Sequence, residues 1–558
     1  MRVADYIAKF LVDNGVNDIF MLTGYGAMYI NDAIEVSGIN YYATRNEAVA
    51  PMMAGSYARL KGTLGVACVT AGPGATNALP GLAESFVDSA PIMIISGQVE
   101  KNHTTYHSKL PLRTYGTAEI NIIPVVKPLT KYAKFLDDPN DVRYVLEKAL
   151  HLAISGRPGP VWIDIPLDIQ NASIQLDQLR SYQVPRSKLD ISPANIDNII
   201  EKLKDAKNPL IVGGHGVRQA KAINEFKTFT DKVAAPVLFS RLGQDLLPHS
   251  NKYVFGQAGL KGSKYCKQIM NKSDLVISLG CRLAPQFVGL NFEAFENAEI
   301  VMVDVDKAEI EKNKNYIDLG INADVKSFLI EINKKLNNNI IPKRIKWLDY
   351  CNDLKANNPI VTLDQKKNPI DLYYFMKLLG DLSNSKNVLV TDAGSNYYVG
   401  GTVWDFENGQ REICSGTNAA MGTTIPLAIG CAVAEPDFQI LAVTGDGSLE
   451  LNIQELKTIS HYSYNIKLFV INNGGYLSMK KWQDDVFEGR RLDTSESTGA
   501  GTLNLSKIAD AFDLDYVRID DYKNIESQLN EIMSNENPLF VEVFTDNYQK
   551  IIEAFRDY

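Results

Sequence analysis

Short apolar runs alternate along the chain with longer segments in which apolar residues recur every three or four positions. The runs form three blocks: LGVACVT, APIMIISG and GPVWIDIP; then NPLIVGG, APVLFS, SDLVISLG and AEIVMVDVD; then NVLVTDAG, FQILAVTG, NIKLFVIN and PLFVEVFT. Short strands parted by helix-length segments are typical of parallel sheets with crossover helices. The pattern therefore predicts an α/β fold with three parallel-sheet units in series.

Polar segments separate the three units. Residues 170–190 (QNASIQLDQLRSYQVPRSKLD) lack a periodic apolar pattern, which indicates a linker. A second polar stretch, rich in Asn and Lys, covers residues 332–346. We therefore expect an N-terminal domain over residues 1–170, a central domain over 190–345 and a C-terminal domain over 365–550.

Composition then excludes several classes of protein. The 558 residues carry a formal net charge of −9, which argues against a nucleic-acid binder. The six cysteines lie far apart without a CxxC pair and the six histidines are scattered, which argues against a disulfide framework or a zinc site. Residues 1–16 show an amphipathic helical pattern rather than a signal peptide, and no apolar segment approaches bilayer length. We expect a soluble cytoplasmic protein without nucleic-acid or membrane partners.

An acid and an amide follow two neighbouring strands of the third unit. Asp446 comes directly after the run FQILAVTG, and Asn473 directly after NIKLFVIN. The segment 449–460 between them (LELNIQELKTIS) has helical apolar spacing, which predicts a βαβ unit with a crossover helix. Both strands then point the same way, so Asp446 and Asn473 should converge at one edge of the sheet. Together with the carbonyl of Gly475 they suit a Mg²⁺ ion that bridges to a diphosphate.

Simpler interpretations of these residues exist. An isolated Gly-Asp-Gly is most often a turn, and an isolated Asn-Asn-Gly-Gly is most often a loop. An EF-hand loop would need a polar ligand where this chain has Leu449. Taken together, and each after a strand, the pair matches the thiamine diphosphate motif, in which GDG is followed by about two dozen residues and NN.

The whole chain resembles the thiamine diphosphate enzymes of the acetolactate synthase type. Residues 45–99, which include RNEAVAP, AGPGATN and IISGQV, are similar to the family's glutamate segment, and residues 415–433 (SGTNAAMGTTIPLAIGCAV) are similar to its SGGLGAMG segment. The resemblance implies three doubly wound domains in the order pyrimidine-binding, central and diphosphate-binding. It also implies thiamine diphosphate and Mg²⁺ as cofactors. Because family members place the glutamate domain of one subunit against the diphosphate domain of another, it implies a homodimer at minimum, with a homotetramer as the larger alternative.

The resemblance assigns roles to individual residues. Glu47 matches the catalytic glutamate, which hydrogen-bonds the cofactor's aminopyrimidine and takes part in its proton exchange. Met421 matches the large apolar residue that bends the cofactor, and Ala419 would offer its backbone carbonyl to the pyrimidine amino group. Asp446, Asn473 and Gly475 would hold the metal. The other cofactor-binding candidates are Gly72, Pro73, Gly74, Ser395, Asn396, Gly447, Ser448 and Leu477.

The central unit resembles the part of acetolactate synthases that holds FAD, so FAD is expected as a third cofactor. The chain also departs from the family. Where the family reads RFDDR, this chain reads RLAPQ, with Ala284 in place of an acid and Gln286 in place of the arginine associated with the second substrate. Asn46 replaces the histidine usual before Glu47, which leaves the cofactor chemistry in place. The FAD-binding candidates are Gly213, Gly214, Gly259, Gly262, Arg282 and Asp324.

The acceptor site decides the reaction. Gln98, Gln286 and Trp482 are the substrate-binding candidates, and Trp482 keeps the place of the family's pocket tryptophan. A glutamine can make only neutral hydrogen bonds, whereas an arginine can pair with the carboxylate of a 2-oxo acid. Since Gln286 stands where that arginine would be, a neutral acceptor is favoured over a second pyruvate.

The resemblance therefore implies a carboligase with small-molecule substrates, which decarboxylates pyruvate and transfers the acetyl unit to a carbonyl acceptor. The segments RLAPQFVGLNFEAF and GYLSMKKWQDDVFEG look closer to members found in bacterial surface-sugar biosynthesis, so a nucleotide-linked keto sugar is one such acceptor. The alternatives are an acetolactate synthase that condenses two pyruvates, a dicarbonyl hydrolase or lyase, and a non-catalytic relative that keeps the cofactor.

Overall fold

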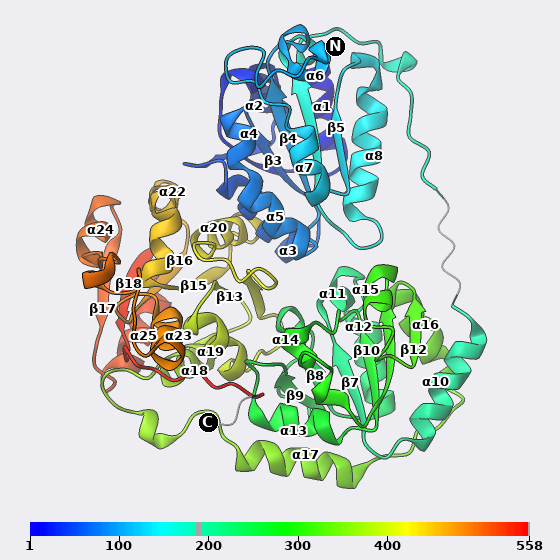
Figure 1. Cartoon of the computed structure of the whole chain (residues 1–558), viewed down its shortest axis with the longest axis vertical. Coiled ribbons are helices and arrows are strands. Elements are labelled where there is room, and N and C mark those ends of the chain that lie inside the picture. Colours follow the sequence, from blue (N-terminus) through cyan, green and yellow to red (C-terminus); the bar gives the residue numbers. More distant parts are fainter. Residues whose placement is uncertain (186–190, 556–558) are drawn as a thin grey trace.

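The protein, seen in a computed structural model that describes residues 1–185 and 191–555, folds into three α/β domains (Figure 1). Each domain contains a six-stranded, wholly parallel sheet with helices packed against it, which confirms the predicted fold class. The sheets occupy residues 18–166, 209–322 and 387–544, inside the three predicted domain ranges. The ends of those ranges stay a prediction, and residues 186–190, which include the end of the predicted linker and the first residue of the predicted central domain, lie outside the described residues.

The N-terminal domain has the strand order β2-β1-β3-β4-β6-β5. The three predicted apolar runs form β3, β4 and β6, which are buried on both faces, while β1, β2 and β5 are four residues each. The strands are β1 (Asp18–Met21), β2 (Asn40–Ala43), β3 (Gly65–Val69), β4 (Ile92–Gln98), β5 (Tyr132–Phe135) and β6 (Val161–Pro166). The helices are α1 (Val3–Asp13), α2 (Met28–Ser37), α3 (Val49–Lys61), α4 (Pro73–Asn77), α5 (Leu79–Val87), α6 (Thr105–Ser108), α7 (Ile123–Val126), α8 (Val142–Ile154) and α9 (Leu167–Gln170).

The central domain has the strand order β12-β11-β10-β7-β8-β9, the order of a doubly wound dinucleotide-binding fold. The chain changes direction across the sheet between β7 and β10, and ligands of such folds bind beyond the carboxyl ends of the strands at this point. The strands are β7 (Pro209–Gly213), β8 (Val237–Phe239), β9 (Val254–Gln257), β10 (Leu275–Leu279), β11 (Glu299–Asp304) and β12 (Leu319–Asn322). The helices are α10 (Pro193–Asp205), α11 (His215–Gln219), α12 (Ile223–Val233), α13 (Lys264–Lys272), α14 (Pro285–Val288), α15 (Lys307–Lys312), α16 (Val325–Leu336) and α17 (Ile345–Asn357).

The C-terminal domain repeats the topology of the N-terminal domain, with the order β14-β13-β15-β16-β18-β17. Its switch point lies between β13 and β15. The strands are β13 (Asn387–Thr391), β14 (Arg411–Cys414), β15 (Gln439–Gly445), β16 (Ile466–Asn472), β17 (Asp515–Ile519) and β18 (Leu539–Phe544). The helices are α18 (Leu372–Leu382), α19 (Ser395–Val403), α20 (Thr424–Ala434), α21 (Asp446–Leu449), α22 (Leu456–Tyr462), α23 (Leu477–Phe487), α24 (Leu505–Ala511) and α25 (Ile525–Ser534).

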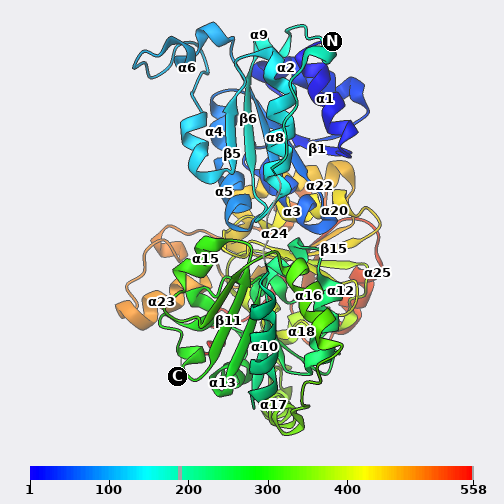
Figure 2. The same ribbon diagram turned by 90° about the vertical axis from the view of Figure 1, so that its right-hand side faces the viewer.

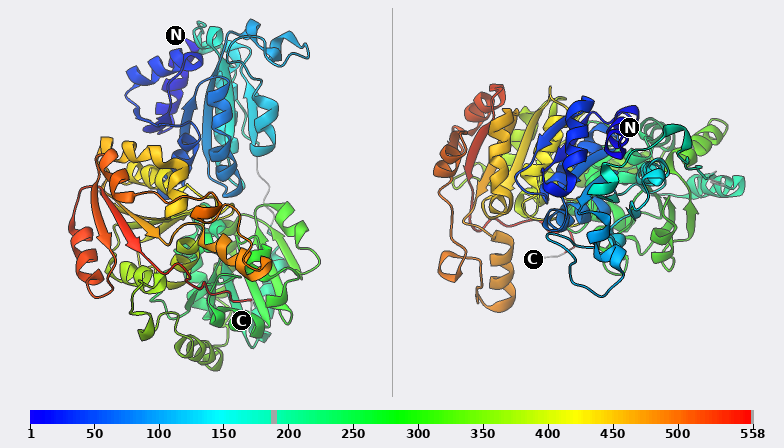
Figure 3. Two further views of the ribbon diagram at one scale, coloured as in Figure 1. Left: turned by 60° about the vertical axis from the view of Figure 1, so that its left-hand side comes forward. Right: turned by 90° about the horizontal axis from the view of Figure 1, so that it is seen from above.

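One apolar core joins the N-terminal and C-terminal domains. Helix α3 packs against α20, and residues of both helices belong to a single cluster of buried side chains. Figure 3 shows the yellow segments of the C-terminal domain directly against the blue N-terminal domain. The helices approach so closely that a Cβ on Gly430 would overlap Ser56 and the backbone of Met53. The two domains are therefore fixed to each other through their helices.

The predicted crossover helix over residues 449–460 is wrong as a continuous element. The structure has α21, a 3₁₀ segment over Glu450–Glu455 and α22, with non-helical backbone at Asn452 (φ −138°). The Asn452 side chain donates a 2.8 Å hydrogen bond to the carbonyl oxygen of Gly422. This contact with a distant loop, which local apolar spacing does not reveal, competes with a regular helix.

Among the described residues, no helix combines the length and apolar character needed to cross a bilayer. The six cysteines are free and buried.

Candidate active site

Two helices begin at the carboxyl edge of the C-terminal sheet, next to its switch point. Helix α19 follows β13 through Gly394, and α23 follows β16 through Tyr476. Strands β13, β15 and β16 are neighbours, so the starts of both helices lie along one edge. The free N–H groups and the dipole at a helix start favour a phosphate. Ser395 and Asn396 begin α19, and Leu477 begins α23, so the predicted diphosphate-lining residues lie at these starts.

The structure brings the predicted metal ligands together at the same edge. Gly445 is paired with Ile471, so Asp446 and Asn473 leave adjacent strand ends. The Asp446 carboxylate accepts hydrogen bonds from the N–H groups of Gly475 (2.8 Å) and Gly447 (3.0 Å). Burial raises the pKa of the Asp446 carboxyl, while these backbone donors act in the opposite direction. A bound cation would stabilise a carboxylate in such a place.

The ligand types at this edge suit Mg²⁺. The described residues contain no group of three or more His, Cys, Asp or Glu side chains that could hold a metal. A cation here would therefore take one carboxylate, one amide and one backbone carbonyl, all of them oxygen ligands of the kind that Mg²⁺ binds alongside water and phosphate. These three oxygen ligands therefore suit a Mg²⁺ ion that is also bound to a diphosphate.

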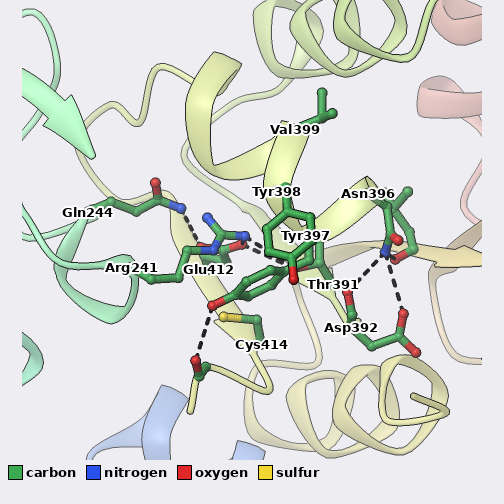
Figure 4. Close-up of polar contacts among 12 residues, drawn as sticks. Arg241, Gln244, Thr391, Asp392, Asn396, Tyr397, Tyr398, Val399, Glu412 and Cys414 are labelled. Atoms are coloured by element: carbon green, nitrogen blue, oxygen red, sulfur yellow. Dashed lines mark hydrogen bonds and ion pairs between the residues drawn. The ribbon is translucent and has the colours of Figure 1, made fainter. Parts of the chain in front are cut away.

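Asp392, which was not predicted from the sequence, holds several groups of this site in place through hydrogen bonds. Its carboxylate accepts hydrogen bonds from the Ser448 hydroxyl (2.5 Å), the Gly422 N–H (3.0 Å) and the Thr444 hydroxyl (3.3 Å). Burial raises its pKa to about 6. Figure 4 shows the Asn396 side chain directed at Asp392. The rule that located Asp446, an acid directly after an apolar strand, applies equally to Asp392 and would have found it.

The loop over residues 415–422 carries the two residues expected to meet the cofactor's pyrimidine. Ala419 adopts a left-handed backbone conformation (φ +48°), which is uncommon for a residue with a side chain. Met421 is half-buried two residues later. Gly422 is held by Asp392, by the Ser448 hydroxyl (2.8 Å) and by Asn452. The C-terminal end of the loop is thus fixed by its own domain.

Glu47 lies in a second set of candidates, within the N-terminal domain. Its carboxylate accepts a 3.0 Å hydrogen bond from the Asn77 amide. A Cβ on Gly74 would lie 3.3 Å from the Glu47 carboxylate, so the absence of a side chain there keeps space open beside it. Gly72 has φ +55° and lies against the backbone of Ala118, and Pro73 is the first residue of α4.

Asn46, the departure from the family's histidine, has a structural contact. Its side-chain oxygen accepts a 2.8 Å hydrogen bond from the Ala48 N–H, so it stabilises the turn that carries Glu47 into α3. The backbone N–H of Arg45 donates to the Glu455 carboxylate of the C-terminal domain (2.7 Å). The turn around Glu47 is therefore fixed from both sides.

The single chain does not join the two sets. The described residues show no hydrogen bond or ion pair between Glu47 and Asp446, Asn473 or Gly475; Glu47 bonds Asn77, and Asp446 bonds the glycines beside it. Glu47 and the predicted metal ligands thus make separate contacts in one copy of the chain.

A cavity of about 750 Å³ opens at the switch point of the central domain. Of the predicted FAD residues, Gly259, Arg282 and Asp324 line it. The other three, Gly213, Gly214 and Gly262, do not line it, and a Cβ on any of them would overlap or crowd neighbouring side chains or backbone. Asp324 also caps α16 through the Ser327 N–H (2.9 Å). The cavity extends to Arg157 of the N-terminal domain and Tyr398 of the C-terminal domain, so it lies where all three domains meet.

The three substrate candidates lie apart. The Gln98 amide is engaged inside its own domain, where it donates to Ile120 (2.9 Å) and Asp164 (3.2 Å). Gln286 is exposed on α14 at the central cavity. Trp482 is 47% exposed on α23, which projects from the molecule in Figure 2. Their roles stay predictions.

Comparisons with known proteins cover almost the whole chain. Residues 1–121, 196–332 and 392–543 match the N-terminal TPP binding domain, the central domain and the C-terminal TPP binding domain of thiamine pyrophosphate (thiamine diphosphate) enzymes. The acetolactate synthase large subunit of Buchnera aphidicola subsp. Schizaphis graminum is 30% identical over 87% of this chain and 85% of its own length.

Two further relatives match at similar levels. The large subunit of Lactococcus lactis is 28% identical over 98% of this chain and 93% of its own length, and the isozyme 3 large subunit of Escherichia coli is 28% identical over 98% and 95%. The chain therefore belongs to the thiamine pyrophosphate enzymes of the acetolactate synthase type.

Proposed function

We propose that the protein is a thiamine diphosphate- and Mg²⁺-dependent carboligase that decarboxylates pyruvate and transfers the acetyl unit to a second pyruvate, which makes acetolactate. The observation that carries this proposal is the edge of the C-terminal sheet, where Asp446, Asn473 and Gly475 lie beside the starts of α19 and α23. The names of the relatives, all acetolactate synthases, favour pyruvate as donor and acceptor.

Asp446, Asn473 and the Gly475 carbonyl would hold Mg²⁺, with the diphosphate against the starts of α19 and α23. The remaining predicted lining residues, Gly447 and Ser448, lie in the turn that Asp392 fixes. When bound, thiamine diphosphate supplies a carbon nucleophile that accepts the acyl unit of a 2-oxo acid. Glu47 would exchange a proton with a ring nitrogen of the pyrimidine, while Ala419 and Met421 hold that ring in place.

The active unit would be a dimer. The resemblance to the family supports this, because its members place the glutamate domain of one subunit against the diphosphate domain of another. The exposed apolar side chains on α23, Met479 (53% exposed) and Trp482, suit burial against a second copy. Size-exclusion chromatography with light scattering should give a dimer or a tetramer, and a stable, fully active monomer would contradict this arrangement.

FAD would bind in the central cavity. The strand order and the cavity volume support a dinucleotide there. Arg157 and Arg282 lie at the cavity wall, where Arg157 pairs with Asp306 (3.0 Å) and Glu309 (2.9 Å), so a pyrophosphate would share their positive charge with those acids. The visible absorption spectrum of the purified protein tests this, because a flavin retained through purification has absorption bands that apoprotein lacks.

A second candidate function differs only in the acceptor. Gln286 is uncharged and exposed at the cavity, which favours a neutral carbonyl, such as that of a nucleotide-linked keto sugar, over a carboxylate-bearing one. The two candidates share the donor half-reaction.

One experiment tests both candidates. The protein, loaded with thiamine diphosphate, Mg²⁺ and FAD, is incubated with pyruvate alone and with pyruvate plus a panel of keto acids, aldehydes and keto sugar nucleotides. Carbon dioxide release and mass spectrometry of the products are the readouts. Acetolactate from pyruvate alone supports the first candidate, and a new adduct with a neutral acceptor supports the second. No carbon dioxide release from pyruvate would refute both and favour a hydrolase, a lyase or a non-catalytic relative.

A further inference from the structure

The loop that carries Ala419 and Met421 is entered through residues 414–418, here called the entry segment. Side chains of the N-terminal domain of the same chain hold this segment. The Asp88 carboxylate accepts hydrogen bonds from the N–H groups of Gly416 and Thr417, both at 2.9 Å. The Arg59 guanidinium donates to the Cys414 carbonyl at 2.8 Å.

These contacts are buried and charged. The Arg59 and Asp88 side chains are 5% and 1% exposed and form an ion pair at 3.4 Å. Hydrogen bonds from backbone N–H groups to a buried carboxylate are among the stronger ones in proteins, and losing the acceptor leaves the donors unsatisfied. The Glu84 carboxylate, one helical turn before Asp88, accepts a further hydrogen bond from the Asn418 amide at 3.2 Å. Four of the five residues of the entry segment thus form hydrogen bonds with side chains of the N-terminal domain.

The C-terminal domain holds mainly the other end of the loop. Its Asp392, Ser448 and Asn452 bind Gly422, as described above. At the entry segment, the Tyr397 hydroxyl donates to the Gly416 carbonyl (3.1 Å; Figure 4). Ala419 and Met421 therefore lie between one anchor supplied by their own domain and one supplied largely by another.

We propose that Asp88 and Arg59 are positioning residues, which hold the entry segment so that Ala419 and Met421 meet the cofactor's pyrimidine correctly. This inference rests on the proposed function, because those two residues have this role only if the chain binds thiamine diphosphate. It gives the N-terminal domain two tasks at two different sites. In the proposed dimer Glu47 would serve the cofactor of the partner subunit, while Asp88 and Arg59 would shape the cofactor site of their own chain.

The test uses Asp88→Asn in the full-length protein. The amide keeps the size of the side chain but accepts one backbone N–H instead of two and presents an N–H₂ group to the other. Affinity for thiamine diphosphate at saturating Mg²⁺, measured by isothermal titration calorimetry, should fall by about 10-fold or more. With cofactor at saturation, kcat should fall more than the KM for pyruvate changes. The thermal midpoint of the cofactor-free protein and its far-UV circular dichroism report on folding.

Asp18→Asn is the matched control. Asp18 is also a buried acid of the N-terminal domain, and it accepts hydrogen bonds from Asn40, Tyr42 and Tyr57 of that domain. Its replacement removes the same charge without touching the entry segment. Cofactor affinity in this variant should stay within about 2-fold of the parent, since the change costs no contact to the loop.

A milder variant decides the case in which Asp88→Asn fails to fold. Asn418→Ala shortens an exposed side chain and removes only the hydrogen bond to Glu84. It should fold like the parent and bind thiamine diphosphate several-fold more weakly. The inference is overturned if Asp88→Asn folds but binds cofactor and turns over like the parent. If Asp88→Asn does not fold, parent-like binding and turnover in Asn418→Ala overturn it. A parent protein that does not bind thiamine diphosphate at all would instead refute the proposed function, so the two failures are distinguishable.

Discussion

At the scale of single residues, two carboxylates at the same sheet edge differ in burial and in the groups that donate hydrogen bonds to them. Asp392 is fully buried and accepts hydrogen bonds from two hydroxyls and one backbone N–H of its own domain. Asp446 is only partly buried, and its carboxylate accepts hydrogen bonds from backbone N–H groups, among them those of Gly447 and Gly475. Asp392 is therefore suited to holding the loop, and Asp446 to binding a cation that arrives with the diphosphate.

The first prediction concerns Asp446. Asp446→Ala removes the charged ligand from a site that must offset the charge of a diphosphate, so thiamine diphosphate should no longer bind in the presence of Mg²⁺ while the fold is kept. Calorimetric titration measures binding, and circular dichroism checks folding. Glu450→Ala is the control, because Glu450 is an exposed acid close by that is not a proposed ligand. Unchanged cofactor binding in Asp446→Ala would rule out the metal assignment.

The second prediction separates binding from chemistry at Glu47. Glu47→Gln keeps the size and a hydrogen-bonding group but cannot exchange a proton, so cofactor binding should persist while kcat falls by roughly 10²-fold or more. Steady-state carbon dioxide release gives kcat. Glu35→Gln, which alters an exposed acid on α2, should leave kcat unchanged. Equal turnover in the Glu47 variant and the parent would refute the role.

The third prediction concerns the acceptor. Gln286→Arg adds a group that can pair with a carboxylate, and such a charge-assisted hydrogen bond is worth about 1.5–3 kcal/mol. The ratio of acetolactate to neutral-acceptor product should therefore rise by roughly 10-fold or more. Leu290→Arg places the same charge at an exposed position nearby and serves as the control. An unchanged ratio would mean that Gln286 does not set the acceptor.

At the scale of elements, apolar runs along the sequence predict most of the buried strands and their order. They do not predict contacts between residues that are far apart in the sequence. The runs became β3, β4 and β6 in the first domain and the buried strands of the other two, because strands covered on both faces must be apolar throughout. The runs missed the six edge strands of the described sheets and the buried strand β1, all of which except β17 are four residues long; the edge strands are β2, β5, β9, β12, β14 and β17. Asp446 and Asn473 were predictable because each directly follows an apolar run, and neighbouring parallel strands end at the same edge of a sheet. Asp88, Arg59 and Asn452 were not, because their partners lie far away in the sequence.

The fourth prediction belongs to the pair α3 and α20. Gly430→Ala would place a methyl group onto Ser56 and the backbone of Met53, and overpacking of this kind costs about 1–3 kcal/mol. The thermal midpoint of the full chain should fall, and cofactor affinity should fall with it as the domains separate. Gly501→Ala, at a glycine with open space around it, should change neither. A parent-like midpoint in Gly430→Ala would show that the helix contact yields easily.

At the scale of the whole molecule, buried charges tie the three domains together. Asp245 of the central domain pairs with Arg218 of its own domain (2.8 Å) and with Arg411 of the C-terminal domain (2.7 Å). These partners hold the pKa of the Asp245 carboxyl well below its usual range, even though burial acts in the opposite direction. Arg411 also donates to the backbone carbonyls of Leu60 and Arg59 in the N-terminal domain. These contacts connect all three domains through the side chains of Asp245 and Arg411.

The fifth prediction uses Glu84, at the boundary of the first and third domains. Burial, with the charge of Asp88 nearby, raises the pKa of the Glu84 carboxyl to about 7 from its ordinary 4.5. Between these values the folded chain keeps a proton that the unfolded chain has lost, so the contribution of Glu84 to stability is full below 4.5 and is lost as the pH rises through 7. Thermal midpoints of the parent should decline more steeply from pH 5 to pH 7.5 than those of Glu84→Gln. Other acids titrate in both proteins and cancel in the difference, so parallel curves would contradict the prediction.

The contact between α3 and α20 also constrains how the protein is made. The first eleven residues of α3 are buried in the finished molecule, and much of that burial is supplied by α20, which ends at Ala434. At ~5–20 residues per second, a ribosome needs roughly 20 to 75 s to proceed from Lys61 to that point. During this interval the N-terminal sheet can already be complete while α3 still presents an apolar face. The face of α3 that packs on α20 therefore stays without this partner until most of the last domain has been synthesised.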